Sequence, residues 1–149
     1  MNDATLLLTR DHAEVKKLFK QYEKLADAEA EGEERQALAA QICTMLTVHA
    51  TIEEEIFYPA ARAAEVESDL LGEAEVEHAS AKDLIAQIRS SDASDPLYNA
   101  KVKVLGEYID HHVKEEQDEL FPKLTRKMDM KAVGAQLQAR KDELMGEAH

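Results

Sequence analysis

The sequence predicts an all-α protein: an antiparallel up-down-up-down four-helix bundle followed by a short C-terminal helix. Three observations support this. Aromatic residues make up only 5% of the 149 residues, glycine and proline number 5 and 3, and Ala, Leu, Glu and Lys are abundant, a composition typical of helices. Long segments repeat apolar residues at steps of three and four. Short polar stretches separate these segments, and short connections favour antiparallel neighbours.

The first predicted helix spans about residues 5–31, and its inward face is formed by Leu8, His12, Val15, Phe19 and Tyr22. The second spans about residues 33–64, with an inward stripe of Leu38, Ile42, Leu46, His49 and Glu53. Gly32 lies in the acidic stretch between them, which we expect to be an exposed turn. Pro59 predicts a bend near the end of the second helix, because proline has no amide hydrogen.

The third predicted helix spans about residues 68–90, with inward-facing Leu71, Ala74, His78, Leu84 and Ile88. The fourth spans about residues 96–128, with Val104, Leu105, Tyr108, His112 and Leu120 on its inward face. Between them lies the linker SSDASDP, in which Asp95 before Pro96 suits the start of a helix.

The length is that of one domain, so we expect a single domain over residues 1–149, with its bundle in about 5–128. The remaining residues, about 129–149, form an amphipathic tail. We expect this tail to be helical over about 131–145, where it either packs across the bundle or frays.

The charge of the chain argues against several classes of partner. Lys and Arg number 18 against 31 Asp and Glu, which gives a net charge of −13. Such a surface repels phosphate backbones and anionic lipids, so we expect no nucleic-acid and no membrane partner, whereas cations are attracted. No apolar run approaches the roughly 20 residues of a membrane helix, and the N-terminus has no leader pattern. Cys43, the single cysteine, excludes an intrachain disulfide, so the sequence predicts a cytoplasmic protein.

The two halves of the sequence repeat each other. DHAEVKKLFKQ from Asp11 matches EHASAKDLIAQ from Glu77, and HATIEEEIFYP from His49 matches HVKEEQDELFP from His112. The matching histidines lie 66 residues apart in the first pair and 63 in the second, so the two matches share nearly one register. Each half is therefore predicted to be a helical hairpin with one His in its first helix and His-x-x-x-Glu in its second.

These repeated residues predict a metal centre in the core of the bundle. His49 and Glu53, like His112 and Glu116, lie one turn apart on the same helix face. One such pair alone is more often a core histidine beside a solvated acid. Two pairs in matching register differ, because burying these imidazoles and carboxylates without a metal is costly. The candidate ligands are His12, His49, Glu53, His78, His112 and Glu116.

The ligand types indicate which metal this centre holds. Four His and two Glu form a nitrogen and oxygen set without thiolate, which disfavours a structural zinc site and copper(I). Six ligands exceed what one tetrahedral ion accepts. If Glu53 and Glu116 each bridge two ions, each ion also has about two terminal histidines. Di-iron carboxylate sites between facing helices have this arrangement.

The motifs resemble those of the hemerythrin-like, or HHE cation-binding, family over about residues 8–126. Each motif is weak alone and specific as an ordered set: Asp11-His12, His49-Ala-Thr-Ile-Glu53 leading to Phe57-Tyr58-Pro59, Glu77-His78, and His112-Val-Lys-Glu-Glu116 leading to Leu120-Phe121-Pro122. The resemblance implies two non-haem iron ions joined by an oxo or hydroxo bridge. It assigns the four histidines as terminal ligands and the two glutamates as carboxylate bridges. It also implies a small ligand, namely oxygen, peroxide or nitric oxide.

The sequence departs from the oxygen-carrying members of that family. They have a further histidine one turn before the one that matches His78, where this chain has Ala74. Their last helix also places an aspartate five residues after its histidine, where this chain has Glu116 at four. One iron therefore lacks a protein ligand unless Glu75 or Glu115 supplies it, and Glu75 is more typical of a solvated acid. An open position favours turnover over reversible carriage, and Ala74→His is expected to fill it.

The predicted function is therefore a non-haem di-iron protein that binds oxygen, peroxide or nitric oxide in the handling of oxygen, iron or redox stress. Two alternatives stay open: a di-iron oxidoreductase that consumes peroxide or oxidises ferrous iron, and a bundle that stores iron or is merely structural.

Four other residues draw attention. Tyr108 either hydrogen-bonds near the centre or is an ordinary core tyrosine, whereas Tyr58 is interpreted as packing at the helix bend. His111 is expected at the surface, and Cys43 as a small buried hydrophobe.

Overall fold

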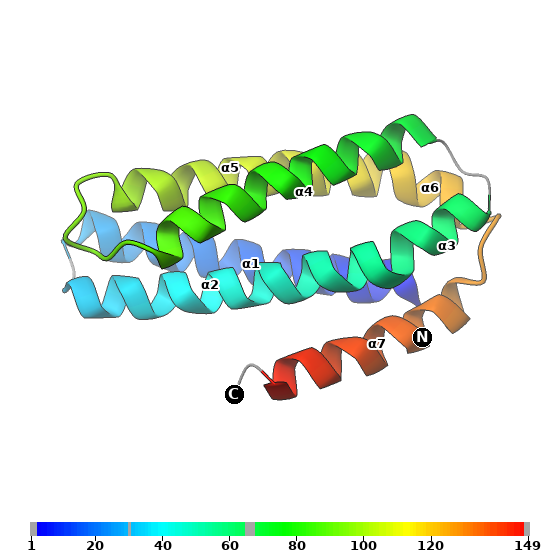
Figure 1. Cartoon of the computed structure of the whole chain (residues 1–149), viewed down its shortest axis with the longest axis horizontal. Coiled ribbons are helices and arrows are strands. Elements are labelled where there is room, and N and C mark those ends of the chain that lie inside the picture. Colours follow the sequence, from blue (N-terminus) through cyan, green and yellow to red (C-terminus); the bar gives the residue numbers. More distant parts are fainter. Residues whose placement is uncertain (1–2, 30, 65–67, 148–149) are drawn as a thin grey trace.

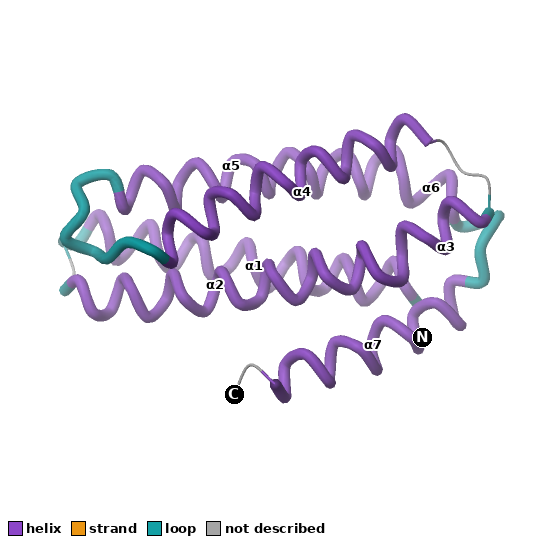
Figure 2. The backbone as a smooth tube through the Cα atoms, viewed as in Figure 1, coloured by secondary structure: helices purple, strands orange, loops and turns teal. Residues whose placement is uncertain are grey.

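The computed structural model describes residues 3–29, 31–64 and 68–147, and long antiparallel helices form its body (Figure 1). α1 (Ala4–Asp27) and α2 (Gly32–Ile52) form the first hairpin. α4 (Ser68–Arg89) and α5 (Tyr98–Glu115) form the second, and each hairpin lies beside the other. Within the described ranges every regular element is helical, as Figure 2 shows. The predicted up-down-up-down bundle is confirmed.

The second helix of each hairpin continues through a π-helical turn into a short helix. η1 (Glu53–Phe57) joins α2 to α3 (Tyr58–Ala63). η2 (Glu116–Leu120) joins α5 to α6 (Phe121–Leu124) in the same way. The internal repeat of the sequence is thus also a repeat of backbone geometry.

Each π-helical turn precedes a proline, Pro59 or Pro122. A proline has no amide hydrogen and its ring clashes with the carbonyl four residues before it, so the preceding turn cannot close as a regular α-helix. The turn widens instead, and the N–H of Tyr58 donates to the carbonyl of Glu53, five residues back. The bend that Pro59 predicts is therefore a π-helical turn, which places side chains five residues apart on nearly the same face.

The first turn differs from its prediction. α1 ends at Asp27 rather than near residue 31. Glu29, with a φ of 52°, occupies the left-handed region in this turn, and Gly32 is instead the first residue of α2. The residue in the left-handed region is therefore a glutamate and not Gly32, so the glycine did not indicate where the turn lies.

The fourth predicted helix is shorter than expected at both ends. It begins at Tyr98 rather than Pro96, because Asp95 accepts the N–H of Leu97 in a local side-chain turn. Its last helical segment, α6, ends at Leu124 rather than near residue 128.

Buried apolar residues form two clusters, one towards each end of the bundle, with a buried polar centre between them. The cluster near α3, α6 and α7 includes Leu8, Ile52, Leu71 and Leu124. The cluster near the opposite turns includes Val15, Ile42, Ile85 and Leu105. Full burial of one such side chain contributes about 1.5–3 kcal/mol, so the two clusters hold the helices together on both sides of the polar centre. Among the described residues, no helix combines the length and apolarity needed to cross a bilayer.

The C-terminal tail packs onto the bundle as α7 (Met130–Glu147), which lies against α1 and α2. Leu137 of α7 is fully buried in the first apolar cluster. Gly134 permits the close approach, because a Cβ there would lie 2.7 Å from the backbone carbonyl carbon of Asp3. Of the two alternatives for the tail, packing is therefore correct, and residues 148–149 lie outside the described residues.

Candidate metal centre

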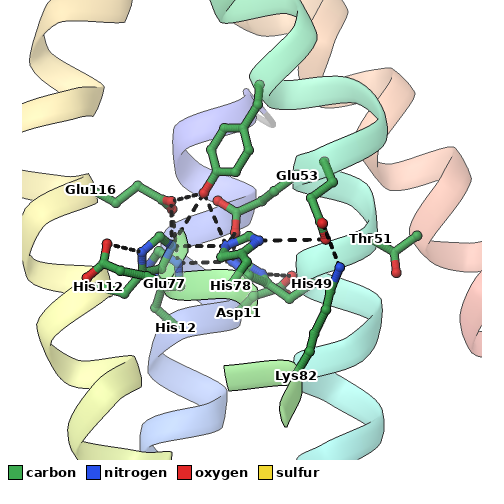
Figure 3. Close-up of polar contacts among 12 residues, drawn as sticks. Asp11, His12, His49, Thr51, Glu53, Glu77, His78, Lys82, His112 and Glu116 are labelled. Carbon is green, nitrogen blue, oxygen red and sulfur yellow. Dashed lines mark hydrogen bonds and ion pairs between the residues drawn. The ribbon is translucent and has the colours of Figure 1, made fainter. Parts of the chain in front are cut away.

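The six residues predicted as ligands meet in the polar centre of the bundle (Figure 3). All six side chains are buried, and every long segment of the bundle contributes. The contributors are His12 from α1, His49 and Glu53 from α2 and η1, His78 from α4, and His112 and Glu116 from α5 and η2.

The ligand atoms form two groups of three, and within each group they all lie within 4.8 Å of one another. The first triad consists of His12, His49 and Glu116. The second triad consists of Glu53, His78 and His112. Each triad takes its two histidines from one half of the repeat and its carboxylate from the other.

Glu53 lies between the two triads. Its Oε1 is 3.1 Å from Nε2 of His49 and 3.3 Å from Nε2 of His78. The side chain is fully buried, and neither oxygen accepts a hydrogen bond of good geometry. A buried carboxylate in that condition is costly unless a cation satisfies it, so Glu53 fits a ligand that bridges two metal ions.

Glu116 spans the same gap from the other half. Its Oε1 lies 3.4 Å from Nε2 of His12, and its Oε2 lies 3.1 Å from Nε2 of His112. Oε1 accepts no hydrogen bond, whereas Oε2 accepts one from the hydroxyl of Tyr58 at 2.8 Å. Its two oxygens thus face different triads, as a second bridging carboxylate requires.

The histidine rings face each other in pairs through Nε2. The two Nε2 atoms are 3.1 Å apart in the pair His12 and His49, and 3.2 Å apart in the pair His78 and His112. Four ring nitrogens with two carboxylates around one buried point form a donor set that fits a pair of transition-metal ions.

Two further carboxylates orient histidines through Nδ1. Asp11 Oδ2 is 3.2 Å from Nδ1 of His49, and Glu77 Oε1 is 3.1 Å from Nδ1 of His112. Such a contact fixes the tautomer that leaves Nε2 available to a metal. Sequence reasoning used these acids only as parts of motifs and missed this role. Their matching positions in the repeat were the signal.

Tyr58 packs in the buried apolar cluster at the bend, as expected, and its hydroxyl in addition enters the polar centre. Its hydroxyl lies 3.2 Å from Nε2 of His78 and 3.4 Å from Nε2 of His112, in addition to its bond with Glu116. In a regular α-helix a residue five positions after Glu53 points about 140° away from it. The π-helical turn removes most of that difference, and sequence periodicity alone could not predict this.

Phe121 takes the matching position in the other half. Its ring stacks on that of His12, with centroids 6.4 Å apart and planes inclined by 7°. A phenyl ring has no hydroxyl, so the Tyr58 hydroxyl adjoins the second triad without a counterpart at the matching position of the other half.

Charge and burial set the protonation of the metal-free cluster. Burial alone would lower the pKa of His49, but the carboxylates of Glu53 and Asp11 raise it to about 10. Burial likewise opposes a rise in the pKa of His112, which Glu116 nonetheless raises to about 9. The pKa of Glu53 lies well below its usual value, because His49 outweighs the effect of burial. Without metal, imidazolium cations and carboxylates neutralise one another, and a metal ion has to displace those protons.

Neither acid suggested for the open position enters a triad. Glu75 is half-exposed and pairs with Arg62 at the surface. Glu115 is partly buried, and its Oε1 lies 3.1 Å from Nε2 of His111. His111 itself is 64% exposed, as predicted. The hydroxyl of Tyr58, and neither of these two acids, lies next to the second triad.

The structure bears on two further expectations. Ala74 is 4% exposed beside a cavity of only about 10 Å³, so a histidine there has little room, and its role as a ligand in Ala74→His stays a prediction. Val104 and Tyr108, both predicted on the inward face, are 40% and 44% exposed, because Val102 and Leu105 set the buried face of α5. Cys43 is buried, as expected of a small hydrophobe, and burial raises the pKa of its thiol.

A small cavity of about 40 Å³ adjoins all four histidines. Its walls are mostly apolar and include Val15, Leu46, Ile85 and Ile109. A space of this size holds one very small molecule. The centre therefore has room for a small ligand beside its ring nitrogens.

Comparisons with known proteins agree with this geometry. Residues 3–124 match the family model of the hemerythrin HHE cation binding domain. A DNA nickase from Nostoc sp. (strain PCC 7120 / SAG 25.82 / UTEX 2576) is 31% identical over 115 residues, covering 77% of this chain and 31% of the nickase. The chain thus spans about a third of that relative's length.

A solved structure is similar over nearly the whole chain. The crystal structure of a hemerythrin HHE cation binding domain-containing protein from Mycobacterium kansasii has a TM-score of 0.81 to this chain at 25% identity. The match covers 99% of this chain and 90% of that one. By its family match, fold and buried histidine and glutamate cluster, this chain belongs to the hemerythrin HHE cation-binding domain family.

Proposed function

We propose that the protein binds two non-haem iron ions and, through them, a small redox ligand: oxygen, peroxide or nitric oxide. The observation that carries this proposal is the pair of buried triads whose two carboxylates each lie close to a histidine of both triads. One triad alone would suit a single ion. Two triads with glutamates facing both suit two ions, and a donor set of imidazole and carboxylate is suited to iron.

Each ion has its own histidines in this proposal. His12 and His49 would hold the first ion, His78 and His112 would hold the second, and Glu53 and Glu116 would offer carboxylate oxygens to both. The Tyr58 hydroxyl is a further donor towards the second ion. Bound iron would supply reversible electron transfer to or from the small ligand.

The rest of the site prepares this chemistry. Asp11 and Glu77 hold the rings of His49 and His112 in place through Nδ1. The apolar walls of the cavity exclude bulk water and limit the ligand to a very small molecule. Burial, with the nearby glutamates, raises the pKa of Tyr58 well above its usual value, so the metal-free protein keeps the hydroxyl proton on Tyr58 as a donor to Glu116.

The second candidate function is a di-iron oxidoreductase that consumes peroxide or oxidises ferrous iron. The unequal surroundings of the two triads favour it, because only the second has an adjoining hydroxyl among these matched positions. Storage of iron as a mineral is disfavoured by the cavity of about 40 Å³. DNA cleavage, the activity in the name of the Nostoc relative, is disfavoured for this chain by its net charge of −13.

The test is anaerobic reconstitution with ferrous iron, followed by optical spectra after separate additions of oxygen, peroxide and nitric oxide. We expect a spectral change with at least one of the three. A change that reverses when the ligand is removed would assign a binding role. Repeated turnovers of peroxide would assign the oxidoreductase. Identical spectra before and after all three additions, at full iron content, would contradict both.

Tyr58→Phe is expected to change the visible spectrum of the ferric protein. A phenolate bound to ferric iron absorbs in the visible range, and phenylalanine keeps the ring but not the oxygen. Tyr98→Phe is the matched control, because Tyr98 is equally buried but lies in the apolar cluster away from the metal centre. An unchanged spectrum in Tyr58→Phe would show that the Tyr58 hydroxyl serves only as a hydrogen-bond donor to Glu116.

A further inference from the structure

We propose that Glu77, His111 and Glu115 form a separate surface site for a divalent transition-metal ion, and that this site loads the buried centre through a crevice beside Ala74. The surface site stands on its own geometry. The loading step rests on the proposed function of the buried centre.

The three side chains already converge on one point at the surface of α4 and α5. Nε2 of His111 is 3.1 Å from Glu115 Oε1 and 3.7 Å from Glu77 Oε2. Their ligand atoms lie within 4.8 Å of one another. His111 and Glu115 have the same spacing of four as the histidine and glutamate pairs of the core. One imidazole and two carboxylates suit a divalent transition-metal ion, with positions left for water.

Glu77 belongs to both sites. Its Oε2 faces His111 at the surface, while its Oε1 accepts from Nδ1 of His112 in the buried centre. The Glu77 side chain is 20% exposed, so the same carboxylate contacts both solvent and His112. An ion held at the surface would therefore lie one carboxylate away from the second triad.

Residues of the surface site and of the buried centre line one small cavity together. This cavity of about 10 Å³ is lined by Glu77 and Glu115 of the surface site, by His112 and Glu116 of the buried centre, and by Ala74. Glu116 is 2% exposed, and its Oε1, which lies 3.4 Å from Nε2 of His12, accepts no hydrogen bond. Ala74 has the smallest side chain of this lining, and carboxylates of both sites lie in it. Position 74, where the oxygen-carrying members of the family have a histidine, thus lies beside the route that we propose for the ion.

Among the described residues of the other half of the repeat, no such surface cluster occurs. The positions 63 residues before His111 and Glu115 are Val48 and Ile52, and both are buried. Asp11, which matches Glu77, pairs with Nζ of Lys141 from α7 at 2.6 Å. A lysine neutralises the orienting acid where α7 covers the bundle. The described residues of α7 do not cover the face of α4 and α5. There, His111 and Glu115 lie beside Glu77 instead of a lysine, so the acid has metal-binding neighbours and, within the described ranges, no neutralising lysine.

The surroundings of the surface site favour capture of a cation. Asp69 and Glu73 line the same open hollow as the three ligands. Carboxylates gathered in a hollow raise the local concentration of cations and their association rate. Exposure of His111 weakens retention, since water competes for the ion. Rapid capture with weak retention is what a loading site needs.

The surface site is tested by counting bound Mn²⁺, using the electron paramagnetic resonance signal of the unbound ion. The variants are His111→Ala and Glu115→Gln, with Glu107→Gln as the control. Glu107 is an exposed carboxylate of the same helix one turn before His111, and it lies outside the cluster. We expect the unsubstituted protein and Glu107→Gln to bind one more Mn²⁺ per chain than His111→Ala and Glu115→Gln. Equal counts in all four proteins would overturn the site, whatever the buried centre holds.

The loading step is tested by the rate of ferrous iron uptake under anaerobic conditions at limiting iron. We expect His111→Ala and Glu115→Gln to load about tenfold more slowly or worse, as loss of electrostatic capture implies. Their final iron content should equal that of the unsubstituted protein. Equal rates alongside a lost Mn²⁺ site would overturn the loading role. A low final iron content in the unsubstituted protein would instead count against the proposed function, and the Mn²⁺ difference would still decide the surface site.

Discussion

Glu53→Gln is expected to retain less than one iron per chain after reconstitution, whereas the unsubstituted protein retains two. Oε1 of Glu53 faces a histidine of each triad, at 3.1 and 3.3 Å, so one substitution removes a donor from both metal positions. A neutral amide does not bridge two cations as a carboxylate does. Removal of groups that only support a metal ligand already costs about 10–100-fold in affinity, and we expect a larger loss here. The measurement is elemental analysis after removal of unbound iron.

Glu55→Gln is the matched control for this substitution. Glu55 lies two residues away in the same π-helical turn, but its side chain is exposed and pairs with Arg140. The substitution removes the same charge and is expected to leave two irons per chain. Glutamine has nearly the same shape as glutamate. The helical circular dichroism signal of both variants shows whether a loss of metal is accompanied by a loss of fold. If Glu53→Gln still binds two irons per chain, Glu53 is not a required metal ligand.

Iron loading is expected to raise the melting temperature of the protein by roughly 8–16 °C. Binding to the folded state alone adds about 4 kcal/mol per site when free iron is a thousandfold above Kd. For a chain of about this length, 1 kcal/mol moves the melting temperature by about 2–4 °C, so one site accounts for the expected shift and a second would add to it. The physical source is the polar centre between two apolar clusters, where both oxygens of Glu53 are buried without a hydrogen bond and would be satisfied by coordination to metal.

The measurement is thermal unfolding followed by circular dichroism, under anaerobic conditions, with and without ferrous iron. Glu53→Gln in the same iron concentration is the control, and we expect little shift in it. The metal-free protein should stay helical, since both apolar clusters remain. Equal melting temperatures for metal-free and fully loaded protein would mean that the centre lies outside the cooperative core.

The sequence predicted the architecture because helix formation depends on local patterns. Apolar steps of three and four residues located the four long helices, and the fold class is confirmed. The six candidate ligands could be selected because the motif occurs twice in one register, which distinguishes His112 from its neighbour His111. The structure brings all six together, and their role as metal ligands stays a prediction.

The parts that could not be predicted depend on departures from regular helix geometry and on contacts between distant segments. Tyr58 enters the centre only because a π-helical turn precedes Pro59, and a spacing of five residues carries no such meaning in an α-helix. Asp11, besides its contact with His49, pairs with Lys141, which lies 130 residues later in the sequence on α7. Helical periodicity gives the face of each helix but not the neighbour that covers it.

The central claim of two bridged irons is tested most directly by the metal content of the unsubstituted protein after anaerobic reconstitution, with iron and zinc supplied in equal amounts. Two triads, with Glu53 and Glu116 each close to histidines of both, predict close to two irons per chain and little zinc. One iron per chain at saturation, or zinc bound in preference to iron, would contradict the di-iron centre.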